Sequence, residues 1–438
     1  MHQIHLTMPL RPNILLTVFT LISLLGSSWA QERKKDKEIP KEQIPVEERD
    51  TGDSLVEDLV ALPGKIIVFP LKLLFLGASK TAGFFDVHSL MLKTTDLLTN
   101  EDGTRRVRPV FTPAMGGGLT FIQDNFSKQG LDFRALGTFG LRSRRFFSGG
   151  LIDPRLFSSK FGLELQGFYQ RLPDEDFFGI GNHAPEQDET NYLHRESNLQ
   201  IAILSNLIEK FIFSLGFVFS NVDIFRGRDS STPSTQDVFS PDEVPGLFGA
   251  EMGSLVFSIY RDSRNRTGNP TRGGEAYFSF ELSKELGGSE FGYRKFILDL
   301  RRYVHLFYNR VLVLRARTEI TDGLNNRETP FFRLSSLGGR NVFRGFRSGR
   351  FRDNDSMVVG LEYRFPIYPV VDAVGFGEEG RVFSDLFDRF SLHDFKYAIG
   401  GGLRFHSKKG GLVAIVEITR GSEGIRFSFS LNEDLRKL

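Results

Sequence analysis

The sequence of 438 residues predicts an all-β fold: a transmembrane antiparallel β-barrel of about 16 strands that follows a short helical or disordered N-terminal extension. Three observations lead to this prediction. An apolar N-terminal run of secretory type directs the chain out of the cytoplasm. Many segments of about ten residues alternate apolar and polar side chains. Their polar faces carry both charges and glycines, which suits the crowded interior of a barrel.

The first 30 residues are typical of a signal peptide. Arg11 supplies a positive charge before the apolar run at residues 14–25, and Ser28 and Ala30 place small residues at the third and first positions before a cut. An uncleaved membrane anchor is the alternative, although the run is short for a transmembrane helix. We expect a signal peptide over residues 1–30 that is cleaved after Ala30 during Sec export.

Two segments separate the signal peptide from the expected barrel. Residues 31–55 are charged and poor in apolar side chains, which predicts a disordered tether. Residues 56–110 contain an apolar run with four interruptions, which favour an amphipathic helical or irregular segment at a membrane interface or a barrel mouth. A buried helix of a soluble domain is the alternative. The interruptions are Pro63, Lys65, Pro70 and Lys72.

Alternating strands are expected throughout residues 111–438, which form the barrel domain. The segment FIFSLGFVFSN places Leu215 and Phe217 on one face and Gly216 and Ser220 on the other. In the same way, MVVGLEYRF places Glu362 on a polar face. Strands are expected to start near Gly116, Leu131, Arg145, Lys160, Leu193, Phe211, Glu251, Gly274, Phe291, Val311, Phe331, Asp355, Val370, Lys396, Gly411 and Gly424.

Alternation alone also fits a soluble β-sandwich, whose apolar faces point inward. The secretory signal, the number and length of the strands and the charged polar faces favour the membrane barrel. A closed barrel also leaves no unpaired backbone edge in hydrocarbon. Long connections such as residues 227–247 are expected to face outward, and short ones at Tyr308-Asn309 and residues 408–411 are expected to be periplasmic turns.

The composition argues against several kinds of protein. A formal net charge of +2 provides no strong field for nucleic acid, so no nucleic-acid partner is expected. The chain has no cysteine, which removes disulfides, thiol nucleophiles and cysteine-bound zinc. Neither H-E-x-x-H nor G-x-S-x-G occurs, so we expect no enzyme, no metal and no cofactor. His183 and His194 flank an acidic loop and are interpreted as surface residues.

The stretch LGGRNVFRGFRSGRF, residues 337–351, packs four arginines and four glycines between two predicted strands. It lacks the G-x-x-x-x-G-K-[ST] pattern of a phosphate loop, and no helix pattern follows it. A solvated loop is the simplest interpretation, because most charge runs are solvated. The alternative is an internal plug, whose buried charge needs a partner.

An ordered series of motifs surrounds this stretch. Phe343, Arg344, Gly345 and Phe346 are followed by E-Y-x-x-P at Glu362, Tyr363 and Pro366, and then by Phe376, Glu378 and Gly380. Upstream lie DFFGIGN at residues 176–182 and the set Asp262, Arg264, Pro270 and Gly273. From residue 116 to the C-terminus the series resembles the BamA/TamA-type bacterial surface antigen superfamily of outer-membrane barrels. Phe343 replaces the usual Val, and Glu378 replaces the usual Asp.

The resemblance implies that the loop folds back into the barrel and that Arg344 docks on its wall. Alternation independently places Glu362 on the polar face, whereas the place of Glu378 rests on motif spacing. Arginine forks suit carboxylates, and a buried arginine needs one. We expect a latch motif at Phe343, Arg344, Gly345 and Phe346, with Glu362, Glu378 and Gly380 as its partners on the wall.

The last strand carries a second resemblance. Gly424, Phe427 and Phe429 match a G-x-x-Φ-x-Φ pattern that is similar to the sorting signal of outer-membrane barrels. The usual terminal aromatic residue is missing, because NEDLRKL follows. An ordinary amphipathic last strand is the alternative.

The family resemblance implies a place in the bacterial outer membrane and a role in outer-membrane biogenesis or in polypeptide or lipid translocation. The implied partners are outer-membrane lipids, a polypeptide or lipid client and periplasmic assembly factors. The short N-terminal extension shows no β-α-α-β-β pattern, so a member without POTRA domains is expected. The alternative is a passive pore or structural surface antigen without assembly activity.

Overall fold

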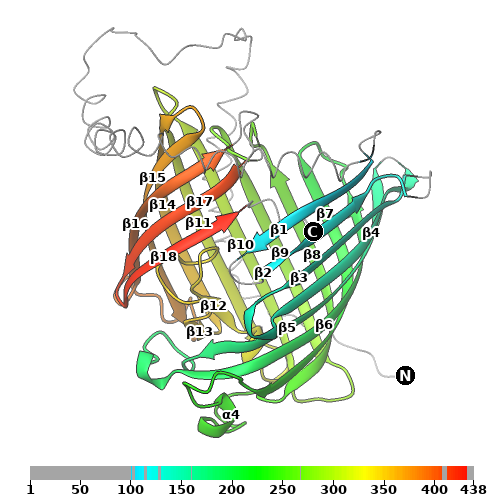
Figure 1. Ribbon diagram of the computed structural model, residues 1–438. Helices are drawn as coiled ribbons and strands as arrows, with labels where there is room; N and C mark the ends of the chain where they lie inside the picture. The colour runs from blue at the N-terminus through cyan, green and yellow to red at the C-terminus, as the bar shows by residue number, and fades with distance from the viewer. Residues whose placement is uncertain are drawn as a thin grey trace. The chain divides into compact units, whose positions relative to one another are not determined.

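The computed structural model describes residues 100, 104–112, 116–126, 130–158, 160–266, 268–406 and 412–431. Sixteen of its strands form one antiparallel sheet in sequence order, which curls into a barrel (Figure 1). The expected all-β barrel of about 16 strands is therefore confirmed. The strands are β1 (Arg105–Thr112), β2 (Gly116–Gln123), β3 (Asp132–Phe139), β4 (Arg145–Ser158), β5 (Phe161–Phe177), β6 (Thr190–Ser205), β7 (Phe211–Arg226), β8 (Gly249–Asp262), β9 (Gly273–Glu285), β10 (Gly292–His305), β11 (Val311–Gly323), β14 (Asp355–Tyr368), β15 (Val371–Phe383), β16 (Lys396–His406), β17 (Leu412–Gly421) and β18 (Gly424–Leu431).

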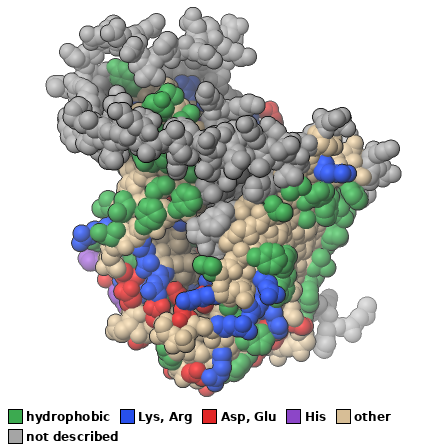
Figure 2. All heavy atoms as spheres, in the orientation of Figure 1, with side chains coloured by type: hydrophobic (Ala, Val, Ile, Leu, Met, Phe, Trp, Pro, Cys, Tyr) green, Lys and Arg blue, Asp and Glu red, His purple; other side chains and the backbone are tan. Residues whose placement is uncertain are grey.

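The sheet turns its apolar faces outward, as the alternation predicts. On β7, Leu215 is 52% exposed and Phe217 is 48% exposed, whereas Gly216 and Ser220 are buried toward the lumen. Figure 2 shows hydrophobic side chains over the strands and charged ones gathered toward the end that carries α4 (Thr235–Val238). A search of the described residues finds no helix with the length and apolar character of a membrane span.

The two ends of the barrel differ in the length of their connections. The longer loops, residues 178–189, 227–248, 324–354 and 384–395, lie at one end, which we call the loop end. The other end, the turn end, holds tight connections such as residues 306–310, where Tyr308 and Asn309 both have positive φ. These two residues provide the left-handed pair that a tight hairpin needs. The expected turn at residues 408–411 lies outside the described residues.

Two sequence expectations about strands are wrong. Phe331 does not start a barrel strand, because it lies in the 3-10 turn η3 (Phe331–Arg333). The short strand β12 (Ser335–Leu337) then pairs with β13 (Phe351–Asp353) instead of with the barrel wall. The barrel also begins before residue 111, because β1 starts at Arg105 and pairs with β2. Pro109 within β1 is tolerated because β1 is an edge strand of the sheet.

Buried apolar side chains form two groups that matter for the site. The first, which we call the lid cluster, joins the ends of β5, β6 and β7 to residues 244–247 and to the long loop 324–354. Its members are Phe177, Tyr192, Val222, Ile224, Val244, Leu247, Phe331 and Leu334. The second, the wall cluster, packs the tip of the long loop against β14, β15 and β16. Its members are Leu337, Phe343, Phe346, Phe351, Val358, Val382 and Ala398.

The expectations for the N-terminal part concern residues that the structure does not describe. The signal peptide at residues 1–30, the tether at 31–55 and most of the segment 56–110 lie there. Within the last segment, residues 105–110 belong to β1.

Candidate functional site

Arg344 lies at the tip of the long loop and contacts three carboxylates. Its backbone N–H and its Nε each donate to Glu378 at 2.8 Å, and its Nη1 donates to Glu362 at 2.8 Å. Nη1 also lies 3.3 Å from an oxygen of Glu417. The guanidinium carbon lies 3.4 Å from the centre of the Phe376 ring, which adds a cation–π contact. The structure therefore brings Arg344, Glu362 and Glu378 together.

Strand register explains why these carboxylates converge. Gly360 on β14 pairs with Glu378 on β15, and Glu362 pairs with Phe376, so all four side-chain positions share the inner face. On β17, Glu417 pairs with Gly402 of β16. Three carboxylates thus point into the lumen from three different strands and lie close together. One short stretch of the loop can contact all three.

Glycine makes this part of the wall thin enough to receive the loop. A side chain at Gly400 would come within 2.5 Å of the Phe376 ring, and one at Gly421 within 3.0 Å of Phe346. Gly380, a predicted partner, leaves room for Leu337 and Phe343, which lie 3.3 Å from where its β-carbon would be. The other predicted residues of the tip, Phe343, Gly345 and Phe346, are all buried.

Gly345 has a backbone conformation that favours glycine. Its φ is +85°, and a β-carbon would lie 3.0 Å from Thr419 and 3.2 Å from Ala398. The two rings that flank Arg344 in sequence, Phe343 and Phe346, stack with their centres 4.8 Å apart. The turn at Gly345 therefore sets both rings and the guanidinium group on the same stretch of wall.

The other arginines of the tip are paired, although the sequence alone gave them no specific role. Arg340 reaches Glu417 at 3.2 Å and donates to the Ser430 hydroxyl at 2.7 Å. Arg347 contacts Glu189, and Arg350 contacts Glu423 at 2.8 Å. From the wall, Arg315 donates to the backbone carbonyls of Asn341 and Val342 at 2.8 and 3.1 Å.

Glu417 is the carboxylate that the motif series missed. Its side chain is 1% exposed, and it contacts both Arg340 and Arg344. The signal was present in the alternation of VAIVEITRG, which places Glu417 on the polar face of an otherwise apolar strand. Its partners could not be identified without the register of β16 and β17.

The upstream motifs have structural roles around the loop. In DFFGIGN, Gly181 donates its N–H to the carbonyl of Arg352 at 2.7 Å, which ties residues 178–189 to the β12–β13 hairpin. The ring of Phe178 lies 4.4 Å from the guanidinium carbon of Arg350. At the turn end, Arg264 contacts Asp262 at 2.8 Å and Glu275 at 3.1 Å.

Two further predicted features are placed as follows. On β18, Phe427 is 71% exposed and points outward. Ser428 and Ser430 point into the lumen, where they contact Glu417 and Arg340. Gly424 starts this strand with a positive φ of 118°, and Phe429 lies within it. His194 is buried with its Nε2 3.1 Å from Glu196, so its interpretation as a surface residue is wrong. Its place on the inner face of β6, beside Phe332, explains the burial.

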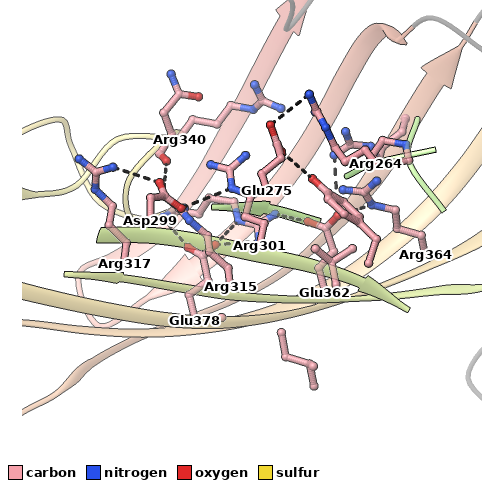
Figure 3. Close-up of a pocket in the computed structure, with 18 of the residues that line it drawn as sticks. Arg264, Glu275, Asp299, Arg301, Arg315, Arg317, Arg340, Glu362, Arg364 and Glu378 are labelled. Carbon is pink, nitrogen blue, oxygen red and sulfur yellow. Dashed lines mark hydrogen bonds and ion pairs between the residues drawn. The ribbon is translucent and has the colours of Figure 1, made fainter. Parts of the chain in front are cut away.

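A cavity of about 580 Å³ lies beside the docked tip (Figure 3). Its lining includes the contact residues just described and a second group of charges around Asp299. The arginines of the lining are Arg264, Arg301, Arg315, Arg317, Arg340, Arg344, Arg364 and Arg404, and the carboxylates are Glu275, Asp299, Glu362, Glu378 and Glu417. Figure 3 shows most of these side chains pointing toward one another across the space.

Comparison with known proteins agrees with this architecture. The model of the Omp85 superfamily domain matches residues 125–433. A solved structure of BamA from Haemophilus ducreyi, which lacks POTRA domains 1–3, is similar with a TM-score of 0.55 and 18% sequence identity, over 75% of this chain and 70% of that one. This likeness shows a common fold, and the family model spans most of the chain. The chain belongs to the Omp85 superfamily of outer-membrane β-barrels.

Proposed function

We propose that this barrel acts in outer-membrane biogenesis or in polypeptide or lipid translocation, and that the long loop is a plug that Arg344 holds on the wall. The observation that carries the proposal is the contact of one arginine with carboxylates from β14, β15 and β17. A loop on the surface would not need a set of buried carboxylates around one arginine. A plug that closes the lumen in one defined position and can also be released needs a docking site of this kind.

The physical chemistry of the contact supports a loop with two positions. Glu378 and Glu417 have side chains that are each 1% exposed, so their charge requires a partner while the loop is docked. Opening the lumen to water would hydrate Arg344 and its three carboxylates, and this would reduce the free-energy cost of separating them. The docked and released states can then differ by little free energy, as a gate requires.

A conductance measurement on the full chain in planar bilayers tests the plug. We expect Arg344→Ala to open the channel several-fold more often than the wild type, because the tip loses its ionic contacts. Arg302→Ala is the matched control, since Arg302 pairs across the sheet with the exposed Leu314 and points away from the lumen. Equal conductance of Arg344→Ala and wild type would refute the plug.

Depletion of the protein from cells, followed by a survey of outer-membrane proteins and lipids, tests the wider role. We expect selected barrels or lipids to decrease. An unchanged outer membrane, together with a steady large current, would favour a passive pore or structural antigen.

Two finer proposals concern maturation. Export would end with cleavage after Ala30, so the mature protein would begin at Gln31, which mass spectrometry of the purified chain checks. The last strand, with Gly424, Phe427 and Phe429, would be read by periplasmic assembly factors. Phe427→Ser would then lower the amount of folded barrel in the membrane, while Phe225→Ser, at another exposed site, would not.

A further inference from the structure

The cavity beside the loop tip is lined by closely spaced arginines. Its lining carries eight arginines and five carboxylates. Asp262 and Glu319 lie outside the lining and pair with Arg264 and Arg317, so one positive charge remains in excess. A cavity of about 580 Å³ is in the size range of small-molecule sites and exceeds the need of a single ion.

The arginines share their carboxylates. Arg317 contacts Asp299 at 3.0 Å, and Arg315 and Arg301 approach the same group at 3.6 and 3.7 Å. A carboxylate offers about four acceptor sites, while each guanidinium group has five donors. Three guanidinium groups therefore converge on Asp299, while Glu319 also pairs with Arg317 and the carbonyls of Asn341 and Val342 accept from Arg315.

The same arrangement recurs around Glu362. Arg364 and Arg344 contact it at 2.6 and 2.8 Å, and Arg404 approaches at 3.8 Å. Positive charge gathered inside a membrane barrel is costly unless an anion balances it. Planar guanidinium forks match the oxygens of phosphate as well as those of carboxylate.

The position of the cavity indicates how a ligand reaches it. Gly268 and Pro270, in the connection between β8 and β9, belong to its lining and lie at the turn end. At the other side of the cavity lie Arg340, Asn341 and Arg344 of the loop tip. A ligand that enters from the turn end therefore meets the arginines before it meets the docked tip.

We propose that this cavity binds a phosphate-bearing ligand whose phosphate competes with Glu362 and Glu417 for Arg344, and so releases the loop tip. The proposal rests on the proposed function, because it assumes that the tip is a plug. The phosphate belongs either to a lipid headgroup or to a soluble phosphate ester. The phosphate of the ligand replaces the wall carboxylates as the anionic partner of Arg344. The tip can therefore leave the wall while Arg344 keeps a partner for its charge.

Binding is tested with the full chain in an uncharged detergent. The soluble probe is inorganic pyrophosphate, and the lipid probes are nanodiscs of phosphatidylglycerol and of phosphatidylcholine. Calorimetry is expected to detect pyrophosphate binding that weakens at least tenfold in Arg301→Gln/Arg317→Gln, because charge-assisted hydrogen bonds are lost. If the double variant does not fold, Arg301→Gln alone replaces it. Arg302→Gln, on the outer face of the same strand, is expected to bind like the wild type.

Release is tested with cysteine reporters, since the chain has no cysteine of its own. Thr419 is buried beneath Gly345, so a maleimide is expected to label Thr419→Cys faster as pyrophosphate or phosphatidylglycerol is added. Thr138→Cys is the matched control, because Thr138 is equally buried on β3, away from the tip. Its labelling rate is expected to stay constant.

The outcomes separate the possibilities. A response to pyrophosphate shows that a soluble phosphate group is sufficient, and a response to phosphatidylglycerol alone identifies a lipid headgroup. Binding without faster labelling of Thr419→Cys overturns the proposal, as does equal weakening by Arg302→Gln. Tighter binding of a tetraglutamate peptide than of either phosphate probe also overturns it. If no probe binds while Arg344→Ala still opens the channel, the phosphate site fails and the proposed plug stands.

Discussion

The long loop is held in two regions that use apolar packing and charge in different proportions. At its base, Phe331 packs edge-on against Phe177 and Tyr192, each with ring centres 5.2 Å apart, inside the apolar lid cluster. At its tip, Arg344 meets three carboxylates, and neighbouring arginines meet three more. The base combines the lid cluster with one ion pair, Arg333–Glu196 at 2.9 Å, whereas the tip combines the wall cluster with a larger set of ion pairs.

This difference separates an anchor from a releasable contact. Apolar packing is non-directional and does not recognise a competing ligand. An ionic contact can be exchanged for another anion, provided that the arginine is never left alone. We therefore expect the tip to move while the base stays in the lid, and four measurements test this contrast.

The largest effect is expected from Arg344→Ala. Removing Arg344 leaves Glu378 as a buried charge without the cation that it contacts, while Glu417 keeps Arg340, and the loss costs about 3–5 kcal/mol. Urea unfolding of the purified barrel in detergent measures the loss. Arg344→Lys is the control that keeps the charge and is expected to recover part of it. A loss below about 1 kcal/mol would show that the tip contact is as weak as a surface pair.

Phe331→Ala is expected to cost slightly less, about 3 kcal/mol, because it leaves a cavity in the lid cluster. The two regions are expected to differ in how the stability change caused by a substitution responds to salt and anions. The effect of Phe331→Ala on the urea midpoint is expected to be the same with and without pyrophosphate. A strong dependence on pyrophosphate would show that base and tip act as one unit.

Gly345→Ala is expected to cost about 2 kcal/mol, because the residue has a φ of +85° and its β-carbon would press on Thr419 and Ala398. Gly375→Ala is the control on the outer face of β15, where no heavy atom lies within 4 Å of the added carbon. It is expected to change the unfolding free energy little. Equal effects of the two variants would mean that the tip adjusts freely on the wall.

The smallest effect concerns acid and the loops around the lid. Hydrogen bonds from Ser231, and then from Arg142, lower the pKa of Asp229 to about 2. Because the folded pKa lies below the ordinary value near 4, this stabilisation is present above pH 4 and is lost as the pH falls from 4 toward 2. Pepsin cleavage of loop 227–248 should therefore rise over this range, measured relative to Asp229→Asn. A constant ratio of the two rates would contradict the assignment.

The sequence was sufficient for the barrel wall because lipid and lumen impose a period of two. The sequence prediction failed where tertiary contacts override this pattern. Phe331 resembled a strand start because the apolar residues around it pack in the lid cluster. The strand β1 was missed because Arg105, Arg106 and Arg108 obscured its alternation. Motif spacing located Arg344, Glu362 and Glu378 in one place. The partners of Arg340, Arg347 and Arg350 required the fold, because residues far apart in sequence supply them.

The glycine-lined wall beneath Arg344 has one more consequence. Gly400 lies beside the edge of the Phe376 ring on the inner face, and the guanidinium group of Arg344 lies over that ring. A methyl group at position 400 would displace the ring and with it the arginine, while the carboxylate oxygens stay in place on their own strands. A change in the barrel wall can thus set how firmly the interior closes, without altering any residue of the loop.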